Sequence, residues 1–114
     1  MKPVEIAIRI YEKNKRYFDN LEVYLEVIKE RTLEILSDAK IYLFGSVVEK
    51  KVHPLSDIDI AIVSDKIPES ADERAGVKIK ILEEFDTFTP FELHLLTRRE
   101  WEFYRRFIKE FREV

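Results

Sequence analysis

Residues 41–64 read IYLFGSVVEKKVHPLSDIDIAIVS, and this stretch decides the fold. The apolar run from Ile41 to Phe44 predicts a short strand, which Gly45 and Ser46 end with a tight turn. A polar loop follows, and the apolar run from Ile60 to Val63 predicts a second strand. The stretch therefore predicts two strands joined by a turn and a polar loop.

Two aspartates stand where the polar loop meets the second predicted strand. Side chains alternate along a strand, so Asp57 and Asp59 are expected on one face and Ile58 on the other. Two neighbouring carboxylates repel each other and resist burial unless a cation lies between them. Mg²⁺ is the expected cation because it prefers oxygen ligands and needs few of them from the protein.

The segment before this stretch, residues 1–37, is predicted to be helical. Its apolar residues recur with helical spacing: Val4, Ala7, Ile8, Tyr11, Phe18, Leu21, Leu25, Ile28, Ile35 and Leu36. The pair Asp19-Asn20 either caps a second helix or lies within one continuous helix, and the sequence leaves both alternatives open. We expect this segment to pack on the sheet rather than to form a free coiled coil.

Two capping boxes organise the part of the chain that follows. Ser70 with Glu73 predicts a helix through about Phe85. The segment FELHLL, residues 91–96, then alternates apolar and polar residues as a third strand. Its phase places Glu92 and His94 together on the face opposite the apolar residues.

The second capping box, Thr97 with Glu100, predicts a C-terminal helix over residues 98–112. The resulting order is helical segment, strand, strand, helix, strand and helix. This order predicts an α/β (α+β) fold, with a small mixed sheet flanked by N-terminal and C-terminal helices. We expect residues 1–114 to form a single domain with a motif-bearing core at 40–97.

Composition narrows the functional classes. The absence of cysteine excludes disulfides and thiolate chemistry, and no apolar run reaches membrane-spanning length. A net charge of −3 argues against a direct, sequence-specific nucleic-acid partner. The protein is expected to be cytoplasmic, and its abundance of Lys, Arg and Glu is thermophile-like. The oligomeric state, including a homo-oligomer, stays open.

The candidate site combines a turn with three carboxylates. Ten residues separate Ser46 from Asp57, Asp59 follows two residues later, and Glu92 lies in phase on the third strand. Such carboxylates on neighbouring strands can hold two Mg²⁺ for in-line phosphoryl displacement. The glycine turn offers backbone N–H groups to phosphate. His94 shares the face of Glu92, so a structural role and a role at the site both stay open.

The pattern Gly-Ser, ten residues, Asp-x-Asp resembles the nucleotidyltransferase superfamily related to DNA polymerase beta, and in particular its minimal members in archaea and bacteria. The resemblance implies that Gly45 and Ser46 bind the nucleotide phosphates. It also implies that Asp57, Asp59 and Glu92 are catalytic and bind Mg²⁺. The implied reaction moves a nucleoside monophosphate, AMP from ATP by expectation, onto a hydroxyl. The implied partner is a HEPN-domain toxin, with this chain as its antitoxin.

The chain departs from the superfamily's pattern in the segment after Gly45-Ser46. Relatives often continue as GSxARG, whereas here residues 47–51 read VVEKK, and the third carboxylate is Glu92 rather than aspartate. A non-catalytic interpretation therefore stays beside the catalytic one. In that interpretation the chain is an antitoxin-like module that neutralises a partner by contact, or a module that senses nucleotide.

Overall fold

A computed structural model describes residues 2–50, 55–85 and 89–114. The elements in chain order are α1 (Pro3–Asp19), α2 (Leu21–Ile35), β1 (Lys40–Phe44), β2 (Ile58–Val63), α3 (Ala71–Leu82), β3 (Phe91–Leu96), α4 (Arg98–Tyr104), the 3-10 turn η1 (Arg105–Phe107) and β4 (Phe111–Glu113). Helices packed on a four-stranded mixed sheet confirm the predicted α+β class. None of the described helices combines the length and apolar character that crossing a membrane requires.

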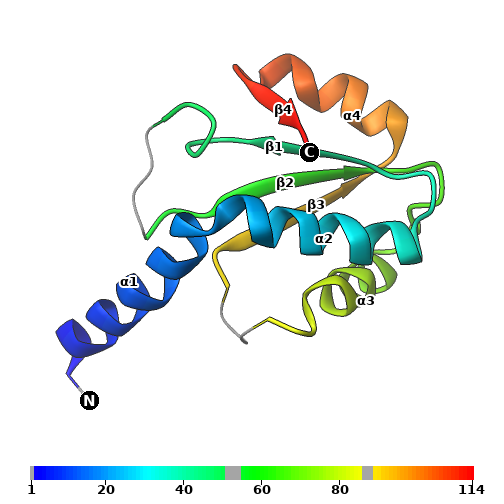
Figure 1. The fold of residues 1–114 in the computed structure, drawn as a ribbon. Coiled ribbons are helices and arrows are strands. Elements are labelled where there is room, and N and C mark those ends of the chain that lie inside the picture. Colours follow the sequence, from blue (N-terminus) through cyan, green and yellow to red (C-terminus); the bar gives the residue numbers. More distant parts are fainter. Residues whose placement is uncertain (1, 51–54, 86–88) are drawn as a thin grey trace.

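The strand order is β3-β2-β1-β4 (Figure 1). Strands β2 and β3 are parallel and joined through α3, whereas β1 pairs antiparallel with both β2 and β4. The register places Phe44 opposite Asp59 and Asp59 opposite Glu92. The sheet therefore aligns the end of β1 with the starts of β2 and β3.

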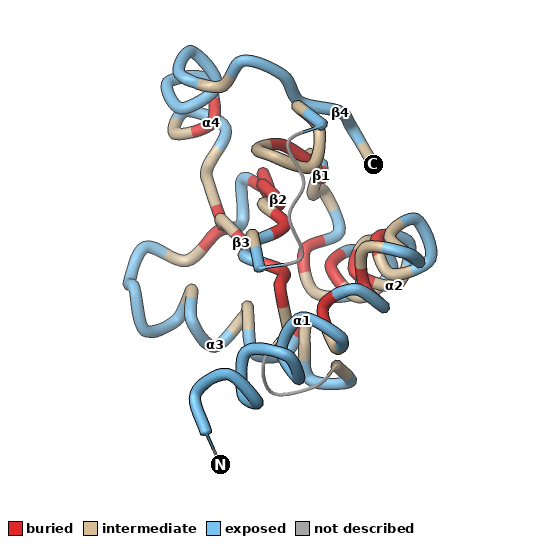
Figure 2. The backbone as a smooth tube through the Cα atoms, turned by 90° about the vertical axis from the view of Figure 1, so that its left-hand side faces the viewer, coloured by how far each residue is buried: buried red, intermediate tan, exposed pale blue. Residues whose placement is uncertain are grey.

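Helices α2 and α3 cover one face of the sheet, and α4 covers part of the other (Figures 1 and 2). The first face carries the larger core cluster, in which Ile60 and Leu93 pack with Ile28 of α2 and Ile81 of α3. On the second face Phe44, Ala61, Val63 and Trp101 form a smaller cluster. Asp59 is in phase with Ala61, so strand alternation directs its side chain to the α4 face.

The N-terminal segment is two helices rather than one. Asn20 separates α1 from α2 and has non-helical backbone angles, and its side-chain amide donates to the Arg16 carbonyl at 2.9 Å. The Asn20 backbone N–H donates to the same carbonyl at 3.2 Å, so both groups of Asn20 close the end of α1 and favour the break. Most of α1 extends away from the sheet (Figure 1).

The predicted C-terminal helix over 98–112 is wrong in its second half. Helix α4 ends at Tyr104, and residues 111–113 form β4 on the edge of β1, with Phe111 opposite Phe44. Strand pairing satisfies backbone groups that β1 would otherwise leave open. Phe111 also packs edge-on against the rings of Tyr42 and Trp101. These long-range contacts outweigh the local helical spacing.

Helix α3 ends at Leu82, three residues before the predicted limit near Phe85. Arg31 of α2 donates to the carbonyls of Lys80 and Ile81, at 2.8 and 3.1 Å. A cation at a helix C-terminus satisfies its free carbonyls and its partial negative charge. The contact from α2 therefore explains where α3 stops.

The carboxylate of Asp38 joins the turn after α2 to the end of β2. It accepts hydrogen bonds from the Ser64 hydroxyl at 2.5 Å and from the Asp65 backbone N–H at 2.8 Å. The Ser64 hydroxyl bond, followed by that of Asp65 N–H, lowers the pKa of Asp38 below its usual value. The ionised carboxylate is thus the form that the fold stabilises.

We expect the Asp38 contact to make stability depend on pH in the acid range. Because the folded pKa lies below the unfolded one, its stabilisation is fully present above pH of about 4 and is lost as pH falls further. The variant Asp38→Asn should unfold more easily than wild type at pH 7, and the difference should shrink as pH drops through this window. Urea unfolding at a series of pH values measures it, and a constant difference would contradict the prediction.

Candidate active site

The site begins at Gly45, at the end of β1. Gly45 has a φ of +82°, and a Cβ at this position would lie 2.5 Å from Oδ2 of Asp59. Only glycine combines that backbone angle with so close an approach. The turn that follows includes Ser46 and closes through hydrogen bonds from the backbone N–H groups of Val48 and Glu49 to the Gly45 carbonyl, both at 3.1 Å. The Gly45 backbone therefore lies against the carboxylate of Asp59.

Asp59 and His94 form a side-chain pair across β2 and β3. Nε2 of His94 lies 3.2 Å from Oδ1 of Asp59, and each side chain is 25% exposed. An imidazole N–H at Nε2 can donate to a carboxylate oxygen at this distance. The imidazole also packs near the rings of Phe44 and Tyr104, with centroids 5.3 and 6.2 Å away. His94 thus orients Asp59 and is itself held by aromatic neighbours.

Glu92 lies beside Asp59 in the parallel register and contacts Asp57, which directly precedes β2. The hydrogen bond with Asp57 and the loss of hydration raise the pKa of Glu92, and the charges of Asp57 and Asp59 act in the same direction. The interaction with His94 acts in the opposite direction and lowers the pKa of Glu92. Two carboxylates that share a proton mark a place where negative charge exceeds what the protein neutralises. The structure thus brings together Asp57, Asp59 and Glu92.

One ligand atom each from Asp59, Glu92 and His94 lie within 4.8 Å of one another, which is close enough to hold a metal ion. Carboxylate oxygens suit Mg²⁺, whereas an imidazole nitrogen suits transition metals better. The neighbouring carboxylates, whose negative charges raise the pKa of Glu92, fit a divalent cation. The residues present therefore fit the expected metal, with His94 as a ligand or as the group that orients Asp59.

The sequence matches the nucleotidyltransferase domain family over residues 25–112. The chain belongs to this family. A crystal structure of a candidate nucleotidyltransferase is 44% identical, with 79% of this chain and 96% of that one covered at a TM-score of 0.66. The fold is also similar to that of a candidate nucleotidyltransferase from Sulfolobus solfataricus, at 19% identity, 91% and 84% coverage and a TM-score of 0.56. No curated protein matches the chain.

The turn of this nucleotidyltransferase keeps a glycine-like conformation without the second glycine. In the pattern GSxARG the last two positions correspond to Glu49 and Lys50. Lys50 has a φ of 58°, in the left-handed region that glycine favours. The departure in sequence therefore does not abolish the turn conformation at this position. Lys51, the next residue of this segment, lies outside the described residues.

The sequence left the role of His94 in this nucleotidyltransferase undecided between the site and the core. Its alternation with Glu92 along residues 91–96 was the signal that could have assigned it to the site. What the sequence lacked was the parallel pairing of β2 with β3, which sets Ala61 opposite His94 and so brings the imidazole near Asp59. His94 is the additional candidate that the structure supplies.

We expect His94→Ala to lower the rate of nucleotidyl transfer by about ten- to hundredfold, the usual cost of losing a group that orients a metal ligand. The variant His94→Gln should recover part of the loss, because its amide can donate to Asp59. Transfer of label from α-labelled ATP at several Mg²⁺ concentrations measures both variants. An unchanged rate in His94→Ala would assign His94 to packing alone.

Proposed function

We propose that this chain is a Mg²⁺-dependent nucleotidyltransferase that moves AMP from ATP to a hydroxyl of a protein partner. The observation that carries the proposal is the group of Asp59, Glu92 and His94, whose ligand atoms lie within 4.8 Å of one another beside the Gly45 turn. Asp57 joins this group through its hydrogen bond with Glu92. Membership of the nucleotidyltransferase family supports the reaction class. A bound Mg²⁺ would supply neutralisation of the triphosphate charge and a lower pKa for the attacking hydroxyl.

In the proposed reaction the acceptor oxygen attacks the α-phosphorus of ATP. A new oxygen–phosphorus bond forms, the bond from the α-phosphorus to the bridging oxygen breaks, and pyrophosphate leaves with that electron pair. Glu92 takes the proton of the hydroxyl, because its carboxylate lies beside Asp59 in the parallel register of β2 and β3. The products are the AMP ester of the acceptor, pyrophosphate and a proton.

Gly45 and Ser46 are proposed to hold the leaving pyrophosphate. The turn over residues 45–50 joins directly to β1 at the edge of the carboxylate cluster. Backbone N–H groups of a glycine turn and a serine hydroxyl are suitable donors to phosphate oxygens. Their fixed position would orient the β- and γ-phosphates before the chemistry begins. Asp57, Asp59 and Glu92 would hold the metal ions.

The choice of ATP, and of a HEPN-domain toxin as the acceptor, rests on the resemblance to minimal nucleotidyltransferases. In this proposal the chain is an antitoxin that inactivates the toxin by attaching AMP to it. The second candidate function is neutralisation by contact alone. Glu49 stands where relatives carry an arginine suited to phosphate, and this observation favours the contact interpretation.

The test incubates the purified chain with Mg²⁺, labelled ATP and the protein encoded by the neighbouring reading frame. Label at the α-phosphate should appear on the partner, whereas label at the γ-phosphate should not, and a kinase would give the reverse. Asp57→Asn and a chelator should each abolish the signal. A stable complex without transferred label would favour the contact module, and nucleotide binding without turnover would favour a sensor.

A further inference from the structure

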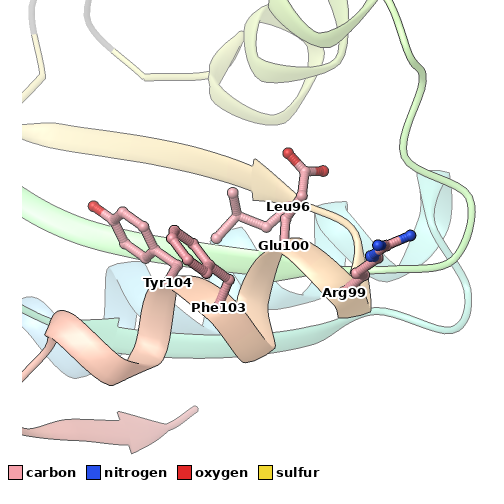
Figure 3. A pocket seen from close by; sticks show the side chains of 5 residues that line it. All are labelled: Leu96, Arg99, Glu100, Phe103 and Tyr104. Atoms are coloured by element: carbon pink, nitrogen blue, oxygen red, sulfur yellow. The ribbon is translucent and has the colours of Figure 1, made fainter.

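A hollow of about 410 Å³ lies between the end of β3 and helix α4 (Figure 3). Its lining residues are Leu96, Arg99, Glu100, Phe103 and Tyr104. Phe103 is 62% exposed, which is unusual for a phenylalanine on a helix that packs against a sheet. Leu96 and the two aromatic rings give the hollow a largely apolar surface.

The hollow and the candidate active site have Tyr104 as a common neighbour. Glu92, His94 and Leu96 alternate with buried residues and so share one face of β3. Tyr104 connects the two regions, because its ring lies 6.2 Å from that of His94 and 5.9 Å from that of Phe44. A ligand whose reacting group lies at Glu92 can therefore extend along β3 into the hollow.

Hydrogen bonds to α3 and at its own start fix helix α4 at the side of the hollow. Arg74 of α3 donates to both carboxylate oxygens of Glu100, at 3.1 and 3.2 Å, and to the carbonyls of Pro68 and Leu95. Thr97 and Glu100 complete a capping box at the start of the same helix. The hollow is therefore pre-formed, which lowers the entropy that a ligand must lose on binding.

The geometry of phosphoryl transfer places the acceptor on this side of the site. In an in-line displacement the attacking and leaving oxygens lie on opposite sides of the phosphorus. The Gly45 turn, proposed for the leaving pyrophosphate, follows β1, and Glu92 lies on β3, with β2 between these strands. The attacking hydroxyl then approaches from β3, which is the side of the hollow.

The outer edge of β3 suits an extended chain. β3 is an edge strand, and no described strand pairs with its outer side. Bonds from Ile58 to Pro90 and from Ser64 to Leu96 turn the backbone groups of the even-numbered residues toward β2. Those of Phe91 and Leu93 therefore point outward, where a partner segment can pair with them.

We propose that the hollow seats an apolar side chain of an extended acceptor segment, four residues from the hydroxyl that receives AMP. This proposal rests on the proposed function. Side chains four residues apart on a strand lie about 13 Å apart on the same face, and Glu92 and Leu96 are separated by the same four-residue step. Nucleic acid suits the hollow less, since Arg99 is the one cation among its lining residues.

The experiment uses an equimolar library of blocked nonapeptides with a central tyrosine, serine or threonine and randomised flanks. The full chain is incubated with the library, α-labelled ATP and Mg²⁺, and the modified peptides are sequenced by mass spectrometry. Wild type should enrich Leu, Ile, Phe or Met four positions from the modified residue. Phe103→Ala should reduce that enrichment roughly fivefold or more. The control Tyr11→Ala removes an exposed ring from α1 and should retain the enrichment.

Calorimetry of ATP binding in the presence of Mg²⁺ distinguishes failure of the docking role from failure of the proposed function. Labelling of peptides without apolar enrichment, or with equal enrichment in Phe103→Ala, would overturn the docking role of the hollow and leave the proposed function standing. Transfer of label to the 3′-hydroxyl of a mixed oligonucleotide instead of the peptides would also overturn it. Failure of wild type to bind ATP would overturn the proposed function itself.

Discussion

Replacing Asp59 by asparagine is expected to reduce nucleotidyl transfer on the order of a thousandfold, because metal-assisted charge stabilisation contributes several kcal/mol. Asp59 lies at the centre of the site, where Gly45, Glu92 and His94 all approach its carboxylate. The amide is nearly isosteric but neutral, so it weakens cation binding without creating a cavity. Transfer of α-label to the partner measures the effect.

The fold should survive the Asp59→Asn change. Removing one of several neighbouring negative charges relieves repulsion, so the free energy of unfolding should stay level or rise. Asp65→Asn, just beyond the other end of β2, is the matched control, since its ion pair with Arg98 is exposed and contributes little. Circular dichroism and urea unfolding report on the fold of both variants. Equal transfer rates in the two variants would remove Asp59 from the mechanism.

Gly45→Ala is expected to damage both stability and activity. The new Cβ would lie 2.5 Å from Oδ2 of Asp59, and a φ of +82° is strained for alanine. Strain of this kind costs about 1–3 kcal/mol. Relief requires the turn or Asp59 to move, so we also expect affinity for Mg²⁺ to fall about ten- to hundredfold. Urea unfolding and titration of nucleotide binding against Mg²⁺ measure the two effects.

The other glycine of the chain provides the control for Gly45→Ala. Gly76 lies within α3, and a Cβ there would meet no atom within 4 Å. Gly76→Ala should therefore stabilise the protein by about 1 kcal/mol through helix propensity, without changing Mg²⁺ affinity. If Gly45→Ala matched Gly76→Ala in stability and in Mg²⁺ affinity, the close approach of the Gly45 backbone to Asp59 would not contribute to function.

Local patterns in the sequence were sufficient to predict β1, β2, β3 and the N-caps of α3 and α4. Thr97 and Glu100 form the predicted capping box, whereas at Ser70 only the side chain accepts from the Glu73 N–H. Alternation along residues 91–96 indicated β3, and Ser70 and Thr97 each begin a helix as predicted. Strand phase is a local property, so the sequence could place Asp57 with Asp59 and Glu92 with His94 on common faces. The parallel pairing that sets Glu92 opposite Asp59 joins strands that are far apart in the sequence, and local patterns do not show it. The helical spacing after Tyr104 led to the wrong prediction of a helix through residue 112, because β4 depends on pairing with a strand about seventy residues earlier. The hollow beside α4 could not be predicted from the sequence either, because it depends on where that helix packs.

The pairing of β4 with β1 has a consequence for the order in which the protein is completed on the ribosome. Strand β1 holds Gly45 at its end, yet its second neighbour comes from residues 111–113, and Val114 donates its N–H to the Ile41 carbonyl at 2.8 Å. During synthesis one edge of β1 therefore stays open until these residues emerge. The nascent chain can assemble β1, β2 and β3 earlier, but it remains prone to mispairing at that edge until β4 arrives.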